Sequence, residues 1–174
     1  TAYEIMPSLV GSEMCIRDRM KVLIQGLGEI PATIELALEE EKPDITHIIC
    51  SEYQASYVAR RAGYREPNRR VIEKAAKKAN AKVKFHICDT FNPKAVSETF
   101  GEIVREIQPG DNVVINYTGG TALVRLLLGA LGVYLSGAFP AKVVYSVRYT
   151  KGIKKFADQT EELKGIFKQL QELL

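Results

Sequence analysis

The feature that most constrains the fold is a repeated alternation, beginning at Lys21, of short apolar segments with longer amphipathic ones. This alternation is typical of a parallel sheet whose strands are joined by crossover helices. Five segments have the character of strands: Lys21–Gln25, Ile45–Cys50, Ala81–Ile87, Asn112–Asn116 and Ala141–Tyr149. We therefore expect an α/β fold, a Rossmann-like parallel sheet of about five to six strands with helices on both faces.

The segments between these strands carry helical periodicity and helix boundary signals. The predicted helices are Ile30–Glu41, Arg65–Lys78, Pro93–Ile107, Gly120–Leu135 and Thr160–Leu174. The fourth is apolar almost all round, which predicts a buried helix. The last is an amphipathic C-terminal helix whose apolar side must be covered, and a dimer partner is one candidate.

The chain of 174 residues has the length of one domain. Residues 1–19 have neither helical nor strand periodicity, and Met20 directly precedes the first predicted strand. We therefore expect a single domain over residues 20–174, with residues 1–19 a disordered or non-native leader, an artefact of the gene model.

Composition narrows the class of protein. The net charge is +3, too small to indicate general coating of nucleic acid, and no apolar run reaches the length of a membrane span. Cys15, Cys50 and Cys88 form no C-x-x-C pair, and His47 and His86 lie inside strand patterns, where a structural role is favoured. We expect a cytoplasmic protein with no metal, no cofactor, no membrane contact and, since no helix-turn-helix is apparent, no DNA binding.

A doubly wound sheet of order 3-2-1-4-5 places the first and fourth strands side by side, with connections that leave in opposite directions. Ligands bind at such a switch point, outside the carboxyl ends of the strands. The two loops there are predicted to be Gly26–Glu29 and Tyr117–Thr121. The sequence thus predicts a ligand site where these loops meet.

Both loops lead from a strand into a helix and contain glycine, so backbone N–H groups and a helix N-terminus are available to an anion. Thr118, Thr121 and Asn116 add polar side chains. A tight turn explains Gly26 and Gly28 equally well. The dinucleotide fingerprint is disfavoured because Pro31 stands at its third glycine position, and no Gly-Lys-Ser/Thr of a P-loop is present.

The segment Val114–Thr121, with Asn-Tyr-Thr-Gly-Gly-Thr at its end, resembles the fourth-strand motif of CARF domains, the CRISPR-associated Rossmann-fold sensors. The polar turn at Gln25–Glu29 and the strand that ends in Ser51-Glu52-Tyr53 agree with it over residues 20 to about 150. The resemblance implies a homodimer that binds cyclic oligoadenylate, most simply cyclic tetra-adenylate, in type III CRISPR antiviral signalling. The pocket it implies involves Gly26, Leu27, Gly28, Ser51, Asn116, Thr118, Gly119, Gly120 and Thr121. Further candidate ligand-binding residues are Gln25, Glu29, Tyr53, Tyr117, Arg125 and Arg148.

The sequence departs from this family in the position of a positive charge. Many members of the family have lysine directly after Gly-Gly-Thr, whereas this chain has Ala122, and Arg125 follows one turn later. Arg148 and Lys151 are other cations near the predicted site. The cluster Arg60, Arg61, Arg65, Arg69 and Arg70 is interpreted as a solvated helix face.

Members of this family differ in what they do with the bound ligand, so the activity of this chain has several alternatives. A chain of this kind cleaves the messenger as a metal-independent ring nuclease, sequesters it, or passes the signal to another protein. Cleavage by a ribose 2′-OH needs alignment and hydrogen-bond donors, for which Ser51, Thr118, Thr121 and Lys151 are the candidate catalytic residues. The alternative outside this family is a monomeric α/β module that binds a mononucleotide or a nucleotide-sugar.

Overall fold

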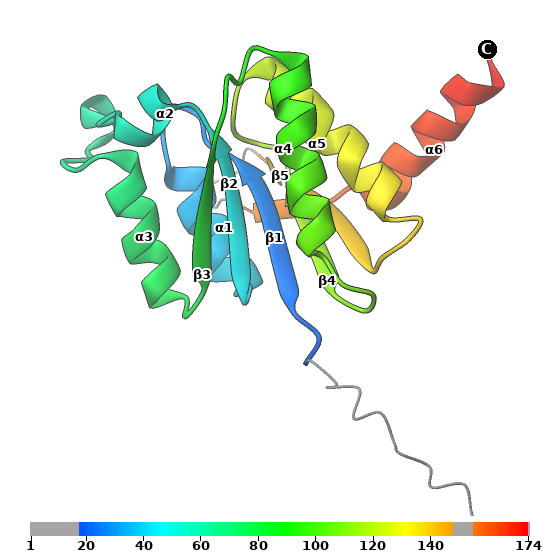
Figure 1. Cartoon of the computed structure of the whole chain (residues 1–174), viewed down its shortest axis with the longest axis horizontal. Coiled ribbons are helices and arrows are strands. Elements are labelled where there is room, and N and C mark those ends of the chain that lie inside the picture. Colours follow the sequence, from blue (N-terminus) through cyan, green and yellow to red (C-terminus); the bar gives the residue numbers. More distant parts are fainter. Residues whose placement is uncertain (1–17, 148–154, 174) are drawn as a thin grey trace, which may run out of the picture.

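The computed structural model describes residues 18–147 and 155–173, which form an α/β fold with one mixed sheet (Figure 1). The expected leader over residues 1–19 falls almost wholly outside these residues, and so do Arg148 and Lys151. The strands are β1 (Lys21–Gly26), β2 (Ile45–Cys50), β3 (Lys82–Ile87), β4 (Asn112–Asn116), β5 (Ala141–Val147) and β6 (Lys155–Asp158). The helices are α1 (Ala32–Glu41), α2 (Glu52–Ser56), the 3-10 turn η1 (Arg60–Ala62), α3 (Asn68–Lys78), α4 (Pro93–Glu106), α5 (Ala122–Leu135) and α6 (Thr160–Glu172).

The strand order is β3-β2-β1-β4-β5-β6, which confirms the predicted order of the first five strands. Those five are parallel, with β1 paired to both β2 and β4. The sixth strand, β6, is antiparallel to β5. It has four residues, too few for a clear alternating pattern, so no sequence signal distinguished it from a loop.

Two apolar layers hold the helices to the sheet. The side chains of Val22 and Ile24 face α4 and α5, whereas Leu23 between them packs with α1 and α3. This alternation is the two-residue period of a strand covered on both faces. β1, β2 and β4 are buried along nearly their whole length, as predicted for central strands.

Local signals fix where the helices begin. Asn92 caps α4, its side chain accepting hydrogen bonds from the N–H groups of Lys94 and Ala95. The helix α2 was missed by the sequence reading, although Ser51 and Gln54 form the two halves of a capping box that precedes it. The predicted starts of α1, α3 and α5 lie two or three residues too early, because Pro31, Pro67 and Thr121 occupy the cap positions.

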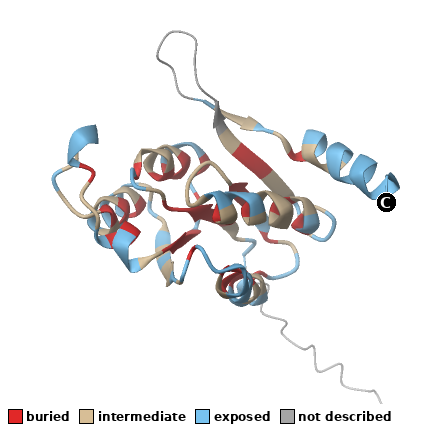
Figure 2. Ribbon diagram, turned by 90° about the horizontal axis from the view of Figure 1, so that it is seen from above, coloured by how far each residue is buried: buried red, intermediate tan, exposed pale blue. Residues whose placement is uncertain are grey.

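The prediction that the fourth helix is buried is wrong. α5 buries Val124 and Leu128 against the sheet, but Leu126 and Tyr134 are exposed. α6 is more exposed still, since Thr160 is its one buried residue among those described, and it extends away from the domain (Figure 2). No helix in the described parts of the chain has the length and apolar character needed to cross a membrane.

His47 and His86 lie in neighbouring strands, and the fold brings their rings together. Nδ1 of His47 is 2.9 Å from Nε2 of His86, and the rings stack with centroids 5.1 Å apart. One of these nitrogens must donate and the other accept, so the bond requires that at least one of the two imidazole rings is neutral. Burial, and then the charge of His86, lower the pKa of His47 from 6.5 to about 4. Burial also lowers the pKa of His86.

This pair predicts that acid destabilises the fold. The unfolded chain takes up protons on these histidines before the folded chain does, so stability is complete above pH 6.5 and falls as the pH falls below it. For His47 the loss amounts to about 2 kcal/mol by pH 5. Urea denaturation at pH 7 and pH 5 measures it, and His47→Gln, which keeps a hydrogen-bonding group, is expected to flatten the dependence. An unchanged pH dependence in that variant would refute this account.

Candidate functional site at the switch point

The loops after β1 and β4 meet backbone to backbone, as the topology predicted. A Cβ atom built on Gly26 would lie 2.6 Å from the carbonyl oxygen of Gly119 and 2.8 Å from Cγ1 of Val124. No real side chain tolerates such distances, so Gly26 is required by the packing of the two loops. The interpretation of Gly26 as a tight-packing residue therefore holds, and the contact also positions the second loop.

Gly120 is required for a different reason. Its φ of +102° lies in the left-handed region, and a Cβ there would be 2.9 Å from Cγ1 of Val124.

Gly28 differs from both, because it has room for a side chain. A Cβ on Gly28 would meet only the backbone nitrogen of Gly120, at an ordinary 3.6 Å. Gly28 thus faces the backbone nitrogen of Gly120 across the gap between the loops.

The turn before α5 offers backbone donors. Within the part of the chain that the structure describes, the N–H groups of Gly119 and Gly120 donate no hydrogen bond to the protein. They precede the N-terminus of the 14-residue helix α5, where the helix dipole is positive. Free N–H groups at a helix N-terminus are suited to a phosphate or another anion.

A buried polar network holds the two strand ends beneath these loops. The Nδ2 of Asn116 donates to Oε1 of Gln25 at 3.0 Å, and Nε2 of Gln25 donates to Oγ1 of Thr46 at 3.1 Å. The Oδ1 of Asn116 accepts from the N–H of Thr118 at 3.1 Å and so shapes the start of the second loop. Gln25 and Asn116 are both almost completely buried, and their direct contact with a ligand stays a prediction.

The side chain of Leu27 is likewise buried in the core. Its N–H donates to the carbonyl of Ile49, which continues the β1–β2 pairing beyond the strand. Glu29 and Ile30, which follow in the same loop, are exposed. The first loop therefore contributes backbone near Gly28 and an exposed carboxylate.

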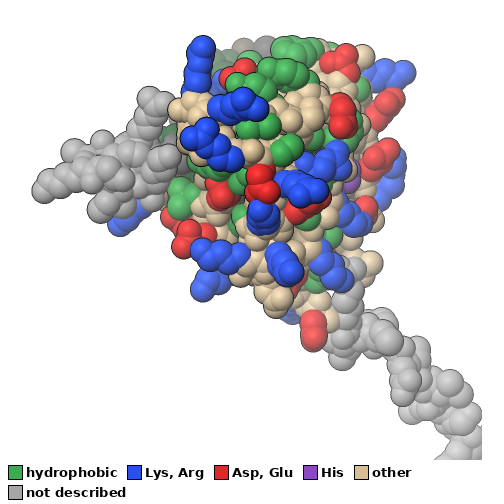
Figure 3. Space-filling view, turned by 90° about the vertical axis from the view of Figure 1, so that its left-hand side faces the viewer, with side chains coloured by type: hydrophobic (Ala, Val, Ile, Leu, Met, Phe, Trp, Pro, Cys, Tyr) green, Lys and Arg blue, Asp and Glu red, His purple; other side chains and the backbone are tan. Residues whose placement is uncertain are grey.

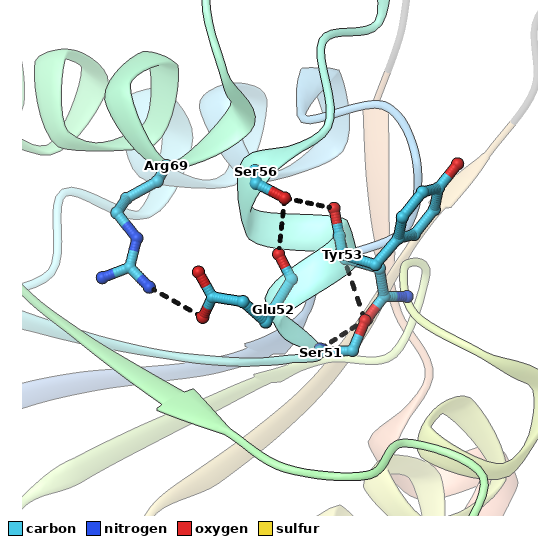
Figure 4. A network of polar contacts seen from close by, with 6 residues as sticks. Ser51, Glu52, Tyr53, Ser56 and Arg69 are labelled. Carbon is cyan, nitrogen blue, oxygen red and sulfur yellow. Dashed lines mark hydrogen bonds and ion pairs between the residues drawn. The ribbon is translucent and has the colours of Figure 1, made fainter.

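Ser51 begins α2 at the carboxyl end of β2 (Figure 4). Its Oγ accepts from the N–H of Gln54 at 3.2 Å, and its N–H donates to Oε1 of Gln54 at 2.8 Å. Ser51 therefore caps α2, and its predicted catalytic role stays a prediction. Tyr53, in the same short helix, is exposed, and its ring lies 5.5 Å from that of Tyr57.

The hydroxyl of Thr121 is also engaged. It accepts from the N–H of Val124 at 3.3 Å as the cap of α5 and donates to the carbonyl of Thr90 at 2.8 Å. Thr90, a buried residue of the loop after β3, had not been singled out in the sequence. Its position after a strand at the same sheet edge was the available signal.

Thr118, Tyr117 and Arg125 open onto a groove of about 1050 Å³. The ring of Tyr117 stacks on Tyr145 at 5.6 Å, and its hydroxyl donates to Oε1 of Gln159 at 2.5 Å. Burial raises the pKa of Tyr117, so its hydroxyl stays protonated. The groove is mainly apolar and is lined by Ile30, Ala32, Thr33, Leu36, Tyr117, Thr118, Ala122, Arg125, Leu126, Gly129, Ala130, Tyr145, Leu163 and Phe167.

Basic residues from α3, β3 and the preceding loop gather on the side of the molecule shown in Figure 3, where acidic side chains lie among them. Arg60, Arg61, Arg65 and Arg70 are exposed, as expected of a solvated surface. Arg69 differs from that expectation. It is half-buried, stacks 4.9 Å above the ring of Phe85, and lies 3.7 Å from a carboxylate oxygen of Glu52.

No group of three His, Cys, Asp or Glu side chains within the described ranges is arranged to hold a metal ion. The groups at the switch point include backbone donors, hydroxyl groups and the exposed Arg125 guanidinium. Such a set can bind and orient an anion.

The fold and this site define a doubly wound, Rossmann-like α/β protein with a glycine-built switch point. Neither a family model nor a curated protein matches the chain. Solved structures do match. Enterococcus italicus Csm6 bound to cyclic hexa-2′-fluoro-hexa-dAMP is 15% identical, with a TM-score of 0.57 over 89% of this chain and 40% of that one.

Can2 from Sulfobacillus thermosulfidooxidans, in complex with cyclic tetra-adenylate, is 12% identical, with a TM-score of 0.52 over 78% of this chain and 36% of that one. This chain therefore spans well under half the length of both proteins. At these identities the two matches show a likeness of fold, and the Rossmann-like α/β fold expected from the sequence is confirmed.

The glycine contacts predict opposite responses at two neighbouring positions. Gly26→Ala is expected to lower the free energy of unfolding by about 1–3 kcal/mol, because its methyl group must displace the Gly119 carbonyl or Val124. Gly28→Ala is the matched control and is expected to change stability little. Urea denaturation of both variants measures the difference, and equal stabilities would contradict the observed packing of the loops.

Proposed function

We propose that this protein binds a cyclic oligoadenylate, cyclic tetra-adenylate first, at the switch point between the loops after β1 and β4. The observation that carries the proposal is the pair of free N–H groups at Gly119 and Gly120, held at the start of α5 by contact with Gly26. The Asn-Tyr-Thr-Gly-Gly-Thr motif resembles that of CARF domains, and two of the matching structures each contain a cyclic oligonucleotide. These features together favour type III CRISPR signalling as the setting.

A phosphate of the ring fits this position on electrostatic grounds. Two backbone donors and the positive end of α5 converge there, and the nearest carboxylate in the first loop, Glu29, is exposed to solvent. The base of the same nucleotide then extends toward the exposed residues that follow the strands. Thr118 and Arg125, which line the adjoining groove, remain candidate ligand contacts.

We also propose that the protein is a homodimer. Ile166 and Leu170 on α6 and Leu173 at its C-cap follow one another at helical spacing and are exposed. A 13-residue helix is marginally stable in water by itself, so α6 requires a covering surface. A second copy supplies one, and a two-fold dimer matches the internal symmetry of a cyclic tetra-adenylate.

Cleavage of the cyclic oligoadenylate stays a prediction, which rests on the resemblance to CARF domains. Of its four candidate catalytic residues, Ser51 and Thr121 use their hydroxyls as helix caps, and Lys151 lies outside the described residues. Thr118 lines the groove. Mass spectrometry of cyclic tetra-adenylate incubated with the protein reports binding and cleavage together, and it separates this function from a monomeric mononucleotide or nucleotide-sugar binder.

Gly28→Asp tests the proposed site without breaking the loop contact. Its carboxylate is accommodated by the backbone but lies beside the N–H of Gly120, where it competes with a phosphate. Calorimetry with cyclic tetra-adenylate is expected to show binding weakened at least tenfold, equivalent to about 1.4 kcal/mol.

Gly28→Asn is the matched control, because it has nearly the same size and no charge. It is expected to bind more tightly than Gly28→Asp. Wild-type affinity in Gly28→Asp, in a protein with unchanged stability, would place the ligand elsewhere.

The dimer is tested by Leu170→Glu, which sets a charge in the exposed apolar stripe of α6. Light scattering is expected to give a dimeric mass for the wild-type protein and a monomeric mass for the variant. Ile87→Glu, at an exposed apolar position on the edge strand β3, is the control and should remain dimeric. A wild-type monomer at micromolar concentration, with and without ligand, would rule the dimer out.

A further inference from the structure

We infer that Phe91 is a stacking platform for one adenine of the bound ring, an inference that rests on the proposed function. Phe91 follows β3 at the same sheet edge as the switch-point loops, and 79% of it is exposed. It belongs to neither of the two apolar clusters of the core. An aromatic ring held in water in this way gains contact area only from a ligand or a partner.

The loop that carries Phe91 is held in place by several hydrogen bonds. The N–H of Phe91 donates to Oδ1 of Asp89 at 3.0 Å, and the N–H of Asn92 donates to the carbonyl of Asp89 at 3.1 Å. Asn92 then caps α4. These bonds restrain the backbone on both sides of Phe91.

The same loop is tied to the candidate anion site. The carbonyl of Thr90 accepts a hydrogen bond from the hydroxyl of Thr121, the residue that caps α5 and directly follows Gly120. Phe91 is the next residue after Thr90, about 3.8 Å further along the backbone. An exposed aromatic residue therefore adjoins the free N–H groups that we assign to a phosphate.

A phosphate donor site beside an exposed aromatic residue is the combination that recognises a nucleotide. The backbone N–H groups bind the phosphate, and the ring offers a flat apolar face to the base. Stacking of this kind accepts any base, and it is strongest for a large purine such as adenine. Phe91 would therefore contribute affinity for the base, while Gly119 and Gly120 bind the charge.

The experiment compares three proteins by calorimetry with cyclic tetra-adenylate. Phe91→Ala is expected to weaken binding about tenfold or more relative to the wild type. Phe91→Tyr preserves a flat ring and should retain wild-type affinity within a few-fold. Tyr134→Ala is the matched control, because Tyr134 is 76% exposed but lies near the opposite end of α5, and it should bind like the wild type.

The outcomes separate this inference from the function on which it rests. If the wild-type protein binds and Phe91→Ala binds equally well, the stacking role is overturned and the proposed function stands. If the wild-type protein does not bind cyclic tetra-adenylate, the stacking role and the proposed function are both overturned. If Phe91→Ala becomes monomeric in light scattering while the wild type is a dimer, Phe91 is a contact between copies and the stacking role is overturned as well. Urea denaturation is expected to give equal stabilities, because the side chain is exposed.

Discussion

The arrangement of the site depends on the backbone contact between Gly26 and Gly119. This contact brings the two loops closer together than any side chain would permit, and the Gln25–Asn116 hydrogen bond holds the strand ends directly beneath it. Both partners of that bond are buried, so breaking it would leave unpaired polar groups in the core. The loops are therefore placed by the sheet itself, before any ligand is present, and such preorganisation lowers the cost of binding.

The loops after β2 and β3 are arranged around this contact. Ser51 and Thr121 had both been predicted to act on a ligand, yet each uses its hydroxyl to cap a helix. Thr121 also bonds to the carbonyl of Thr90, so the loop after β3 is fixed to the start of α5. These two hydroxyl groups thus organise the backbone, and within the described residues the backbone N–H groups of Gly119 and Gly120 donate no hydrogen bond.

Much of the fold was readable from local patterns because each pattern has a direct physical cause. Continuous apolar segments predicted the central strands, and the order of the first five strands followed from the rules of crossover connections. The predicted burial of α5 failed for an equally physical reason. Apolar character all round a helix indicates that something covers it, but not whether that surface belongs to the same chain, and Leu126 and Tyr134 are exposed in this one.

The sequence by itself determined the five parallel strands of the sheet, the two loops at the switch point and the glycines that they require, since these follow from apolar periodicity, chain topology and the absence of a Cβ. The tertiary structure decided which side chains are free to meet a ligand. It buried Gln25 and Asn116, and it exposed Phe91 next to Thr90, whose carbonyl is bonded to the cap of α5. It also joined His47 to His86 across two strands. These outcomes depend on contacts between residues 39 to 91 positions apart, and such contacts arise from the packing of the whole domain rather than from any local pattern.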